Sequence, residues 1–157
     1  MVTRSIHQWF QDYGVSHQDP TNKVVHWICV PVIYFCVVGL LWSIPTPDVS
    51  PFKGRHLWAM LGVALVSIFY VRLSLGLMIG MALWSILCLF LCHYLELYAP
   101  WPLWTLCVAL FVAAWIGQFI GHKIEGKKPS FMHDLQFLII GPAWLMGFVY
   151  RKLGIPY

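Results

Sequence analysis

Four of the seven histidines lie beside the ends of long apolar runs, where their imidazoles can gather at a membrane surface. His17 and His26 lie before and at the start of the first run, and His122 and His133 lie between the last two. Apolar runs supply no catalytic groups, whereas clustered imidazoles bind iron, zinc or copper. If the chain threads so that all four face one side, the sequence predicts a transition-metal site at that membrane rim.

The first pair of histidines flanks a predicted helix start. Asp19 followed by Pro20 is typical of an N-cap and a first helical residue. Asn22 and His26 are four residues apart and therefore share a face of that helix. His17 precedes the cap, so the break lets its arm fold back toward His26. The alternative is a solvated His17 and an interfacial His26 bonded to backbone.

The second group lies at the end of the fourth apolar run. Gln118, His122 and Glu125 have the spacing i, i+4 and i+7, which places them on one helical stripe. Glu125 could ligate a metal, orient His122 or act as a base, and the alternative is a salt bridge with Lys123 or Lys128.

These groups define a candidate site. The predicted metal ligands are His17, His26, His122 and His133. The candidate catalytic residues are Asn22 and Glu125, and the residues expected to support the ligands are Gln118 and Asp134. Gly117 and Gly121 on the same helix as His122 would permit close helix packing.

The composition is that of a membrane protein. Of 157 residues, 60% are hydrophobic and 10% charged, against about 25% charged in a soluble domain. We expect a single transmembrane domain over residues 1–157. The net charge of +4 is modest and the basic residues cluster at run ends, which argues against nucleic-acid binding. The polar N-terminus lacks a cleavable signal peptide, and the five cysteines read as buried hydrophobes.

Five apolar runs set the expected architecture. They are Val24–Ile44, Leu57–Val71, Leu73–Cys92, Leu103–Gly121 and Leu135–Tyr150. The second and third form a hairpin whose turn lies near Arg72–Gly76. The last is short and contains Gly141-Pro142, so it either spans with thinning, re-enters or lies at the interface. The sequence therefore predicts an all-α membrane bundle of four to five apolar helices, with the metal-binding residues at its cytoplasmic rim.

The positions of Lys and Arg predict the orientation. With five spans, six basic residues lie on the side of the N-terminus and four on the other, and the bias becomes eight against two if the last run does not cross. Both counts place the N-terminus and the four rim histidines in the cytoplasm. The membrane would be a bacterial inner membrane or that of the endoplasmic reticulum.

The two histidine groups resemble motifs of the Mpo1-like family of membrane proteins. The first match is H-x4-N-x3-H-x4-P from His17 to Pro31, and the second is QFIGHKIEGKKPSF followed by DLQFLIIGP, from Gln118 to Pro142. The similarity covers nearly the whole chain, with matching length and order of runs.

This resemblance implies an activity. Members are expected to be iron(II)-dependent dioxygenases that need no 2-oxoglutarate, shorten 2-hydroxy fatty acids by one carbon and release C1 as CO2. The substrates would be a 2-hydroxy fatty acid and O2, with the acyl tail in the bilayer or between helices. His17, His26 and His122 match motif histidines, and the fourth ligand is left open between His133 and Glu125.

Three other classes of protein compete with this interpretation. A membrane binding or assembly protein would use the histidines structurally. A haem-binding electron carrier is disfavoured because the histidines lie at helix ends rather than at matched depths. A transporter is disfavoured because no run carries an ionisable residue at mid-span, apart from Arg72 in a predicted turn. The oligomeric state and the preferred chain length do not follow from the sequence.

Overall fold

The computed structural model describes residues 5–46, 56–132 and 136–157. The elements in these ranges are α1 (Ile6–Gly14), α2 (Pro20–Ser43), α3 (Leu57–Leu73), α4 (Leu75–Tyr98), α5 (Leu103–Glu125), the 3₁₀-helix η1 (Ser130–Met132) and α6 (Phe137–Leu153). The described ranges contain helices and loops and no strand. The predicted all-helical class is therefore confirmed.

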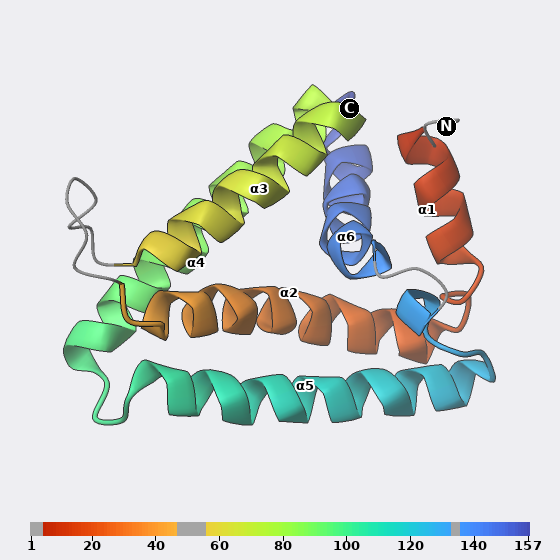
Figure 1. Ribbon diagram of the computed structural model, residues 1–157. Helices are drawn as coiled ribbons and strands as arrows, with labels where there is room; N and C mark the ends of the chain where they lie inside the picture. Colours follow the sequence, from red (N-terminus) through yellow and green to blue (C-terminus); the bar gives the residue numbers. More distant parts are fainter. Residues whose placement is uncertain (1–4, 47–55, 133–135) are drawn as a thin grey trace.

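The helices pack as a long antiparallel pair, a helical hairpin and two further helices beside them. The antiparallel helices α2 and α5 lie side by side along most of their length, and α3 and α4 form a hairpin inclined to them (Figure 1). Helix α6 lies between this hairpin and α1, and it contacts α1, α2 and α4. The end of the bundle where α2 begins and α5 ends, called the site end below, carries α1, η1 and the start of α6.

Helix α2 begins where the sequence predicts. The Asp19 carboxylate accepts hydrogen bonds from the backbone N–H groups of Thr21 and Asn22, and Pro20 is the first helical residue. The turn between α3 and α4 falls at Ser74, within the predicted Arg72–Gly76. These two signals are local, so no packing partner is needed to specify them.

Helix α1 is not among the elements that the sequence predicts, because the N-terminal segment was described only as polar. A capping box starts it, with Ser5 and Gln8 each bonded to the other's backbone N–H. Its buried side chains recur at helical spacing and are Ile6, Trp9, Phe10 and Tyr13. This face packs on α6, and Trp9 meets Phe137 edge to face at 5.3 Å.

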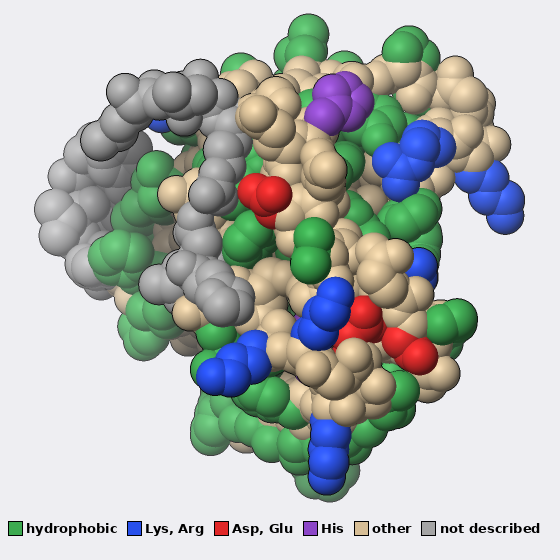
Figure 2. Space-filling model, turned by 90° about the vertical axis from the view of Figure 1, so that its right-hand side faces the viewer, with side chains coloured by type: hydrophobic (Ala, Val, Ile, Leu, Met, Phe, Trp, Pro, Cys, Tyr) green, Lys and Arg blue, Asp and Glu red, His purple; other side chains and the backbone are tan. Residues whose placement is uncertain are grey.

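The outer surface of the bundle is apolar. Helices α2, α4 and α5 are long and apolar enough to cross a membrane, and α3 is apolar but shorter. Large hydrophobic side chains stand exposed along them, among them Leu65, Leu83, Phe90 and Val112. Figure 2 views the site end, where Lys, Arg, Asp and Glu side chains gather among apolar ones. The molecule is thus a multi-pass helical membrane protein.

Candidate metal centre

His17 lies in the loop between α1 and α2, with 1% of its surface exposed. Its Nδ1–H donates a 2.6 Å hydrogen bond to the backbone carbonyl of Tyr13. The Tyr13 ring stacks on the imidazole, with 4.0 Å between ring centroids. Because Nδ1 carries the proton, Nε2 presents its lone pair to the interior. The end of α1 therefore sets both the tautomer and the orientation of this histidine.

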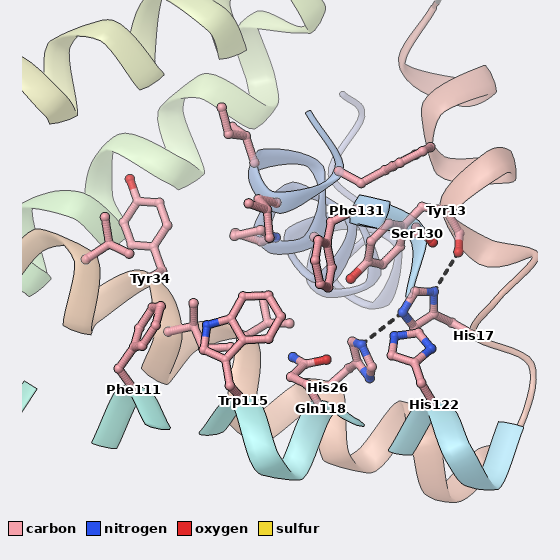
Figure 3. Close-up of a pocket in the computed structure, with 18 of the residues that line it drawn as sticks. Tyr13, His17, His26, Tyr34, Phe111, Trp115, Gln118, His122, Ser130 and Phe131 are labelled. Atoms are coloured by element: carbon pink, nitrogen blue, oxygen red, sulfur yellow. Dashed lines mark hydrogen bonds between the residues drawn. The ribbon is translucent and has the colours of Figure 1, made fainter. Parts of the chain in front are cut away.

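His26 lies in the second turn of α2 and is equally buried. Its Nδ1–H donates to the backbone carbonyl of Asn22 at 2.9 Å. Its Nε2 atom lies 2.9 Å from Nε2 of His17 (Figure 3). The loop before α2 thus folds back and brings the two imidazoles together.

The contact between these two rings is of the kind that a bound cation would satisfy. Both Nδ1 atoms donate to carbonyls, so both Nε2 atoms carry lone pairs, and two facing acceptors are unfavourable when buried. A proton shared between them would require one charged ring. Burial, and after it the neighbouring His26 ring, lower the pKa of His17 to about 3. A metal ion satisfies both nitrogens without protonating either ring.

His122 brings a third imidazole from the last turn of α5, and it is 5% exposed. Its ring centroid lies 5.0 Å from that of His17 and 4.9 Å from that of His26. One ring nitrogen from each of the three histidines lies within 4.8 Å of the others. Nδ1 of His122 is buried and has no hydrogen-bond partner among the described residues. The donor set of three neutral imidazoles therefore fits a transition metal.

Glu125 ties the end of α5 to the start of α2. Its Oε1 accepts from the backbone N–H of Gln18 at 2.8 Å, and its Oε2 accepts from that of Asp19 at 2.7 Å. The negative charge also lies at the positive end of the α2 dipole. Both oxygens are occupied by the loop that carries His17, so in this arrangement Glu125 holds the loop in place.

Asn22 links Glu125 to His26. Its side-chain amide donates to Oε2 of Glu125 and to the backbone carbonyl of Ser16, each at 3.2 Å. Its own backbone carbonyl accepts from His26. Asn22 is fully buried, and its Oδ1 has no hydrogen-bond partner among the described residues. A Cβ on Gly121 would collide with this oxygen, so α2 and α5 approach closely at the glycine, as predicted.

Two further contacts close the site end. The hydroxyls of Ser16 and Ser130 share a hydrogen bond, which joins the loop before α2 to η1. Lys127 Nζ donates to the backbone carbonyl of Val15 at 2.6 Å. The segment after α5 therefore covers the loop that holds His17.

The predicted site residues divide into three groups. His17, His26, His122, Asn22 and Glu125 lie together, as described above. Gln118 lies one turn before His122, is 7% exposed and lines the cavity beside the histidines (Figure 3). His133 and Asp134 lie outside the described residues, so their roles stay predictions.

Sequence reasoning missed Tyr13 and Ser16. Tyr13 supplies the carbonyl and the ring that orient His17, and Ser16 bonds Ser130. The signal for Tyr13 was present, because Ile6, Trp9, Phe10 and Tyr13 recur at the spacing of a helix with one buried face. Ser16 has no comparable pattern in the sequence.

A cavity of about 280 Å³ extends from the three histidines into the bundle. Helix α2 lines it with His26, Val30, Ile33, Tyr34 and Val37, and α5 lines it with His122, Gln118, Trp115 and Phe111. Each set follows one stripe of its helix, and each begins at a histidine. The rest of the wall comes from α6, from Val66 of α3 and from the site end; its residues are Phe137, Leu138, Ile139, Gly141, Pro142, Val66, Tyr13, His17, Ser130 and Phe131. The cavity is therefore polar at one end and apolar beyond it.

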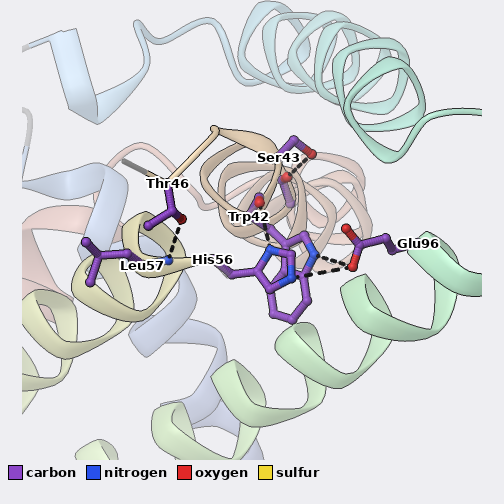
Figure 4. Close-up of polar contacts among 7 residues, drawn as sticks. Trp42, Ser43, Thr46, His56, Leu57 and Glu96 are labelled. Carbon is purple, nitrogen blue, oxygen red and sulfur yellow. Dashed lines mark hydrogen bonds and ion pairs between the residues drawn. The ribbon is translucent and has the colours of Figure 1, made fainter. Parts of the chain in front are cut away.

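The opposite end of the bundle holds a second polar cluster of different character (Figure 4). The His56 ring stacks on Trp42 at 3.6 Å, and its Nδ1–H donates to the backbone carbonyl of Trp42 at 3.0 Å. Glu96 accepts from Trp42 Nε1 at 3.2 Å and lies 3.5 Å from Nε2 of His56. These contacts fasten the start of α3 to the ends of α2 and α4, a structural role.

Comparisons with known proteins give the family. Residues 3–153 match the family described as 2-hydroxy-palmitic acid dioxygenase Mpo1-like. The chain is 33% identical over 146 residues to the 2-hydroxy-palmitic acid dioxygenase MPO1 of Saccharomyces cerevisiae, which covers 90% of this chain and 78% of the yeast protein. No solved structure gives a significant match. The family match over nearly the whole chain, together with the identity to the yeast protein, shows that the chain belongs to the Mpo1-like family.

Proposed function

We propose that this protein is an iron(II)-dependent dioxygenase that shortens 2-hydroxy fatty acids by one carbon and releases CO2. The observation that carries the proposal is the position of three neutral imidazoles at the polar end of an otherwise apolar cavity. The yeast relative is named for 2-hydroxy-palmitic acid, which has a polar head and a long apolar tail. A substrate of that shape matches the two ends of the cavity.

The proposed reaction needs no 2-oxoglutarate or other reductant. One 2-hydroxy acid and one O2 give the acid that is one carbon shorter, one CO2 and one water. The bond between C1 and C2 breaks, C2 becomes the new carboxyl carbon, and C1 leaves as CO2. All four electrons that reduce O2 come from these two carbons, so the substrate itself is the only electron donor.

His17, His26 and His122 would hold the iron in this proposal, with the fourth ligand still open. Iron(II) held there would supply positions for the substrate carboxylate and hydroxyl and for oxygen. Glu125 would act through the loop and Asn22 rather than as a ligand, because both of its oxygens accept from N–H donors. The Gln118 amide, which faces the cavity next to His122, would donate to the carboxylate of the substrate.

The remaining residues would position and shield the head group. The carbonyls of Tyr13 and Asn22 keep two Nε2 lone pairs aimed inward. The apolar wall of α6 and the rings of Trp115 and Phe131 exclude water from the reacting carbons. We also propose that the site end faces the cytoplasm, because most Lys and Arg residues lie on that side.

A product assay tests the proposal. The protein is purified in detergent without oxygen and supplied with iron(II), 2-hydroxypalmitate and air. The products are then identified by mass spectrometry. We expect pentadecanoic acid and CO2 from the wild type without added 2-oxoglutarate. His122→Ala should lose the product, whereas His93→Ala, an exposed histidine near the opposite end, should keep it.

Two other outcomes would contradict the proposal in different ways. No product from folded, iron-loaded protein would reject this substrate. No product together with no metal affinity would favour a non-enzymatic membrane binding or assembly protein with structural histidines.

A further inference from the structure

We infer that the cavity measures the acyl chain, and that Tyr34 of α2 and Phe111 of α5 form the floor that sets the longest 2-hydroxy fatty acid accepted. This inference rests on the proposed function. Both residues line the cavity, and each lies about two helical turns or more beyond the histidine of its own helix. The argument depends on what stands behind them and on how they are held.

A tightly packed cluster stands behind the floor. Tyr34 and Phe111 pack against a buried group that consists of Cys36, Val38, Cys88, Cys92, Leu103 and Cys107. The four cysteines of this group are completely buried. A Cβ on Gly39 would collide with Sγ of Cys107, so α2 and α5 leave no space between them there. A tail that reaches the floor therefore finds no space between α2 and α5 beyond it.

The tyrosine of the floor is held in place. Ser85 of α4 donates its hydroxyl hydrogen to the backbone carbonyl of Met81 at 2.7 Å. The Tyr34 hydroxyl lies 2.7 Å from Ser85 Oγ, so it donates to that oxygen. The ring of Tyr34 is thus anchored to a third helix and cannot swing aside without breaking a buried hydrogen bond.

The length of the cavity gives a number of carbons. From His122 to the floor residue Phe111 on α5, the wall spans 11 residues, which is about 16 Å at the rise of an α-helix. An extended alkyl chain advances about 1.3 Å per carbon, because its bonds are about 1.5 Å long and bent. The wall then holds about 13 carbons beyond the head group, or an acid of about 15 carbons in all.

Binding of 2-hydroxy acids from C12 to C20 tests the floor without turnover. Metal-free protein in detergent is titrated with each acid, and the ratio of variant to wild-type affinity at each length cancels partitioning into the detergent. Wild-type affinity should rise about fourfold for each methylene that becomes buried, and stop rising near C16. A second readout is the distribution of products when an equimolar mixture of these acids is turned over.

Two variants should move the break, which is the chain length at which the affinity stops rising, in opposite directions. Phe111→Ala opens the floor, so C18 should gain about fifteenfold over C16 relative to the wild type as two further methylenes are buried. Ile33→Phe fills the cavity nearer the histidines, so the break should fall below C16. Phe90→Ala removes a phenyl ring from the lipid-facing side of α4 and should leave the profile unchanged. Each variant is first checked for helix content and a single elution peak.

The outcomes separate this inference from the proposed function. Products with the same length profile in wild type, Phe111→Ala and Ile33→Phe would overturn the floor and leave the dioxygenase in place. A length break that shifts as described, without turnover of any acid, would overturn the dioxygenase and keep the floor. Affinity that rises without a break through C20, or binding of no acid at all, would also overturn the floor.

Discussion

His17 and His26 each donate a hydrogen bond from Nδ1–H to a backbone carbonyl. Their Nε2 atoms, which carry lone pairs, therefore face each other at a distance of 2.9 Å. The third ring, His122, adds a buried Nδ1 with no partner among the described residues. Buried polar atoms in folded proteins nearly always find partners. Unpartnered ring nitrogens gathered in this way are expected where a cation completes the structure, which favours a metal at this position.

Glu125 is expected to act on the metal through the positions of other residues. Glu125→Gln keeps the size of the side chain but replaces one acceptor oxygen with an NH2 group, which would face N–H donors of Gln18, Asp19 or Asn22. The loop that carries His17 and the first turns of α2, which carry His26, should then shift relative to the end of α5. We expect the affinity for cobalt(II) or iron(II) to fall about tenfold or more, as is usual when a residue that holds metal ligands in place is changed.

Titration of metal-free protein with cobalt(II), followed by its visible absorption, measures this effect. Glu96→Gln is the matched control, because Glu96 also accepts from neighbouring side chains but lies at the opposite end of the bundle. Unchanged cobalt affinity in Glu125→Gln would show that the loop holds its position without the carboxylate. Complete loss of binding would instead favour Glu125 as a direct ligand.

At the scale of elements, the site depends on how closely α2 approaches α5. A methyl group on Gly121 would collide with Oδ1 of Asn22, the residue that joins His26 to Glu125. We expect Gly121→Ala to cost about 1–3 kcal/mol of stability by overpacking. It should also weaken cobalt binding. Asn22 must move away from α5, and its backbone carbonyl, which orients His26, moves with it.

Gly117→Ala provides the comparison one turn earlier on the same helix. Its Cβ would lie 2.9 Å from Sγ of Cys29, the end of a side chain that can rotate away. Thermal unfolding and cobalt titration of both variants separate the two effects. We expect Gly117→Ala to keep the wild-type cobalt affinity. Equal losses in both variants would mean that helix separation in general, and not the Asn22 contact, controls the site.

The elements also show why part of the fold could be predicted and part could not. The Asp19-Pro20 start of α2 and the Ser74 turn rest on local chemistry, so the sequence was sufficient for them. The meeting of His17 with His26 followed from the break before Pro20. The helix α1 was missed because polar residues are numerous in this segment and its apolar residues form a single face. That face becomes buried only when it packs on α6.

At the scale of the whole molecule, the cavity could not be predicted. Helices α2 and α5 are apolar on every face, so the stripe that lines the cavity has the same character as the stripes that face outward. Hydrophobic periodicity identifies a buried face only when the other face is polar. The only sequence signal for the lining stripe is that its residues share a helix face with His26 or His122. This signal becomes useful only once it is known which helix packs against that face.

The path of α6 determines on which side of the membrane the chain ends. Helix α6 begins at Phe137, which contacts Tyr13 beside the three histidines. Near its end the Tyr150 hydroxyl donates to the backbone carbonyl of Gly76, just after the turn between α3 and α4 (Figure 1). If α2, α3, α4 and α5 cross the membrane in turn, that turn faces the same side as the three histidines. Both ends of α6 then lie on one side, so we expect α6 not to cross.

Labelling of single introduced cysteines in sealed, oriented vesicles tests this topology. Four crossings place the C-terminus on the same side of the membrane as the N-terminus, and Arg151 and Lys152 with it, so that eight of the ten Lys and Arg residues lie on that side. A membrane-impermeant thiol reagent should reach Ile155→Cys and Gln11→Cys from the same face, and the exposed Trp101→Cys in the α4–α5 loop from the other. Labelling of Ile155→Cys together with Trp101→Cys would mean that α6 crosses, and the bias in charge would fall to six against four.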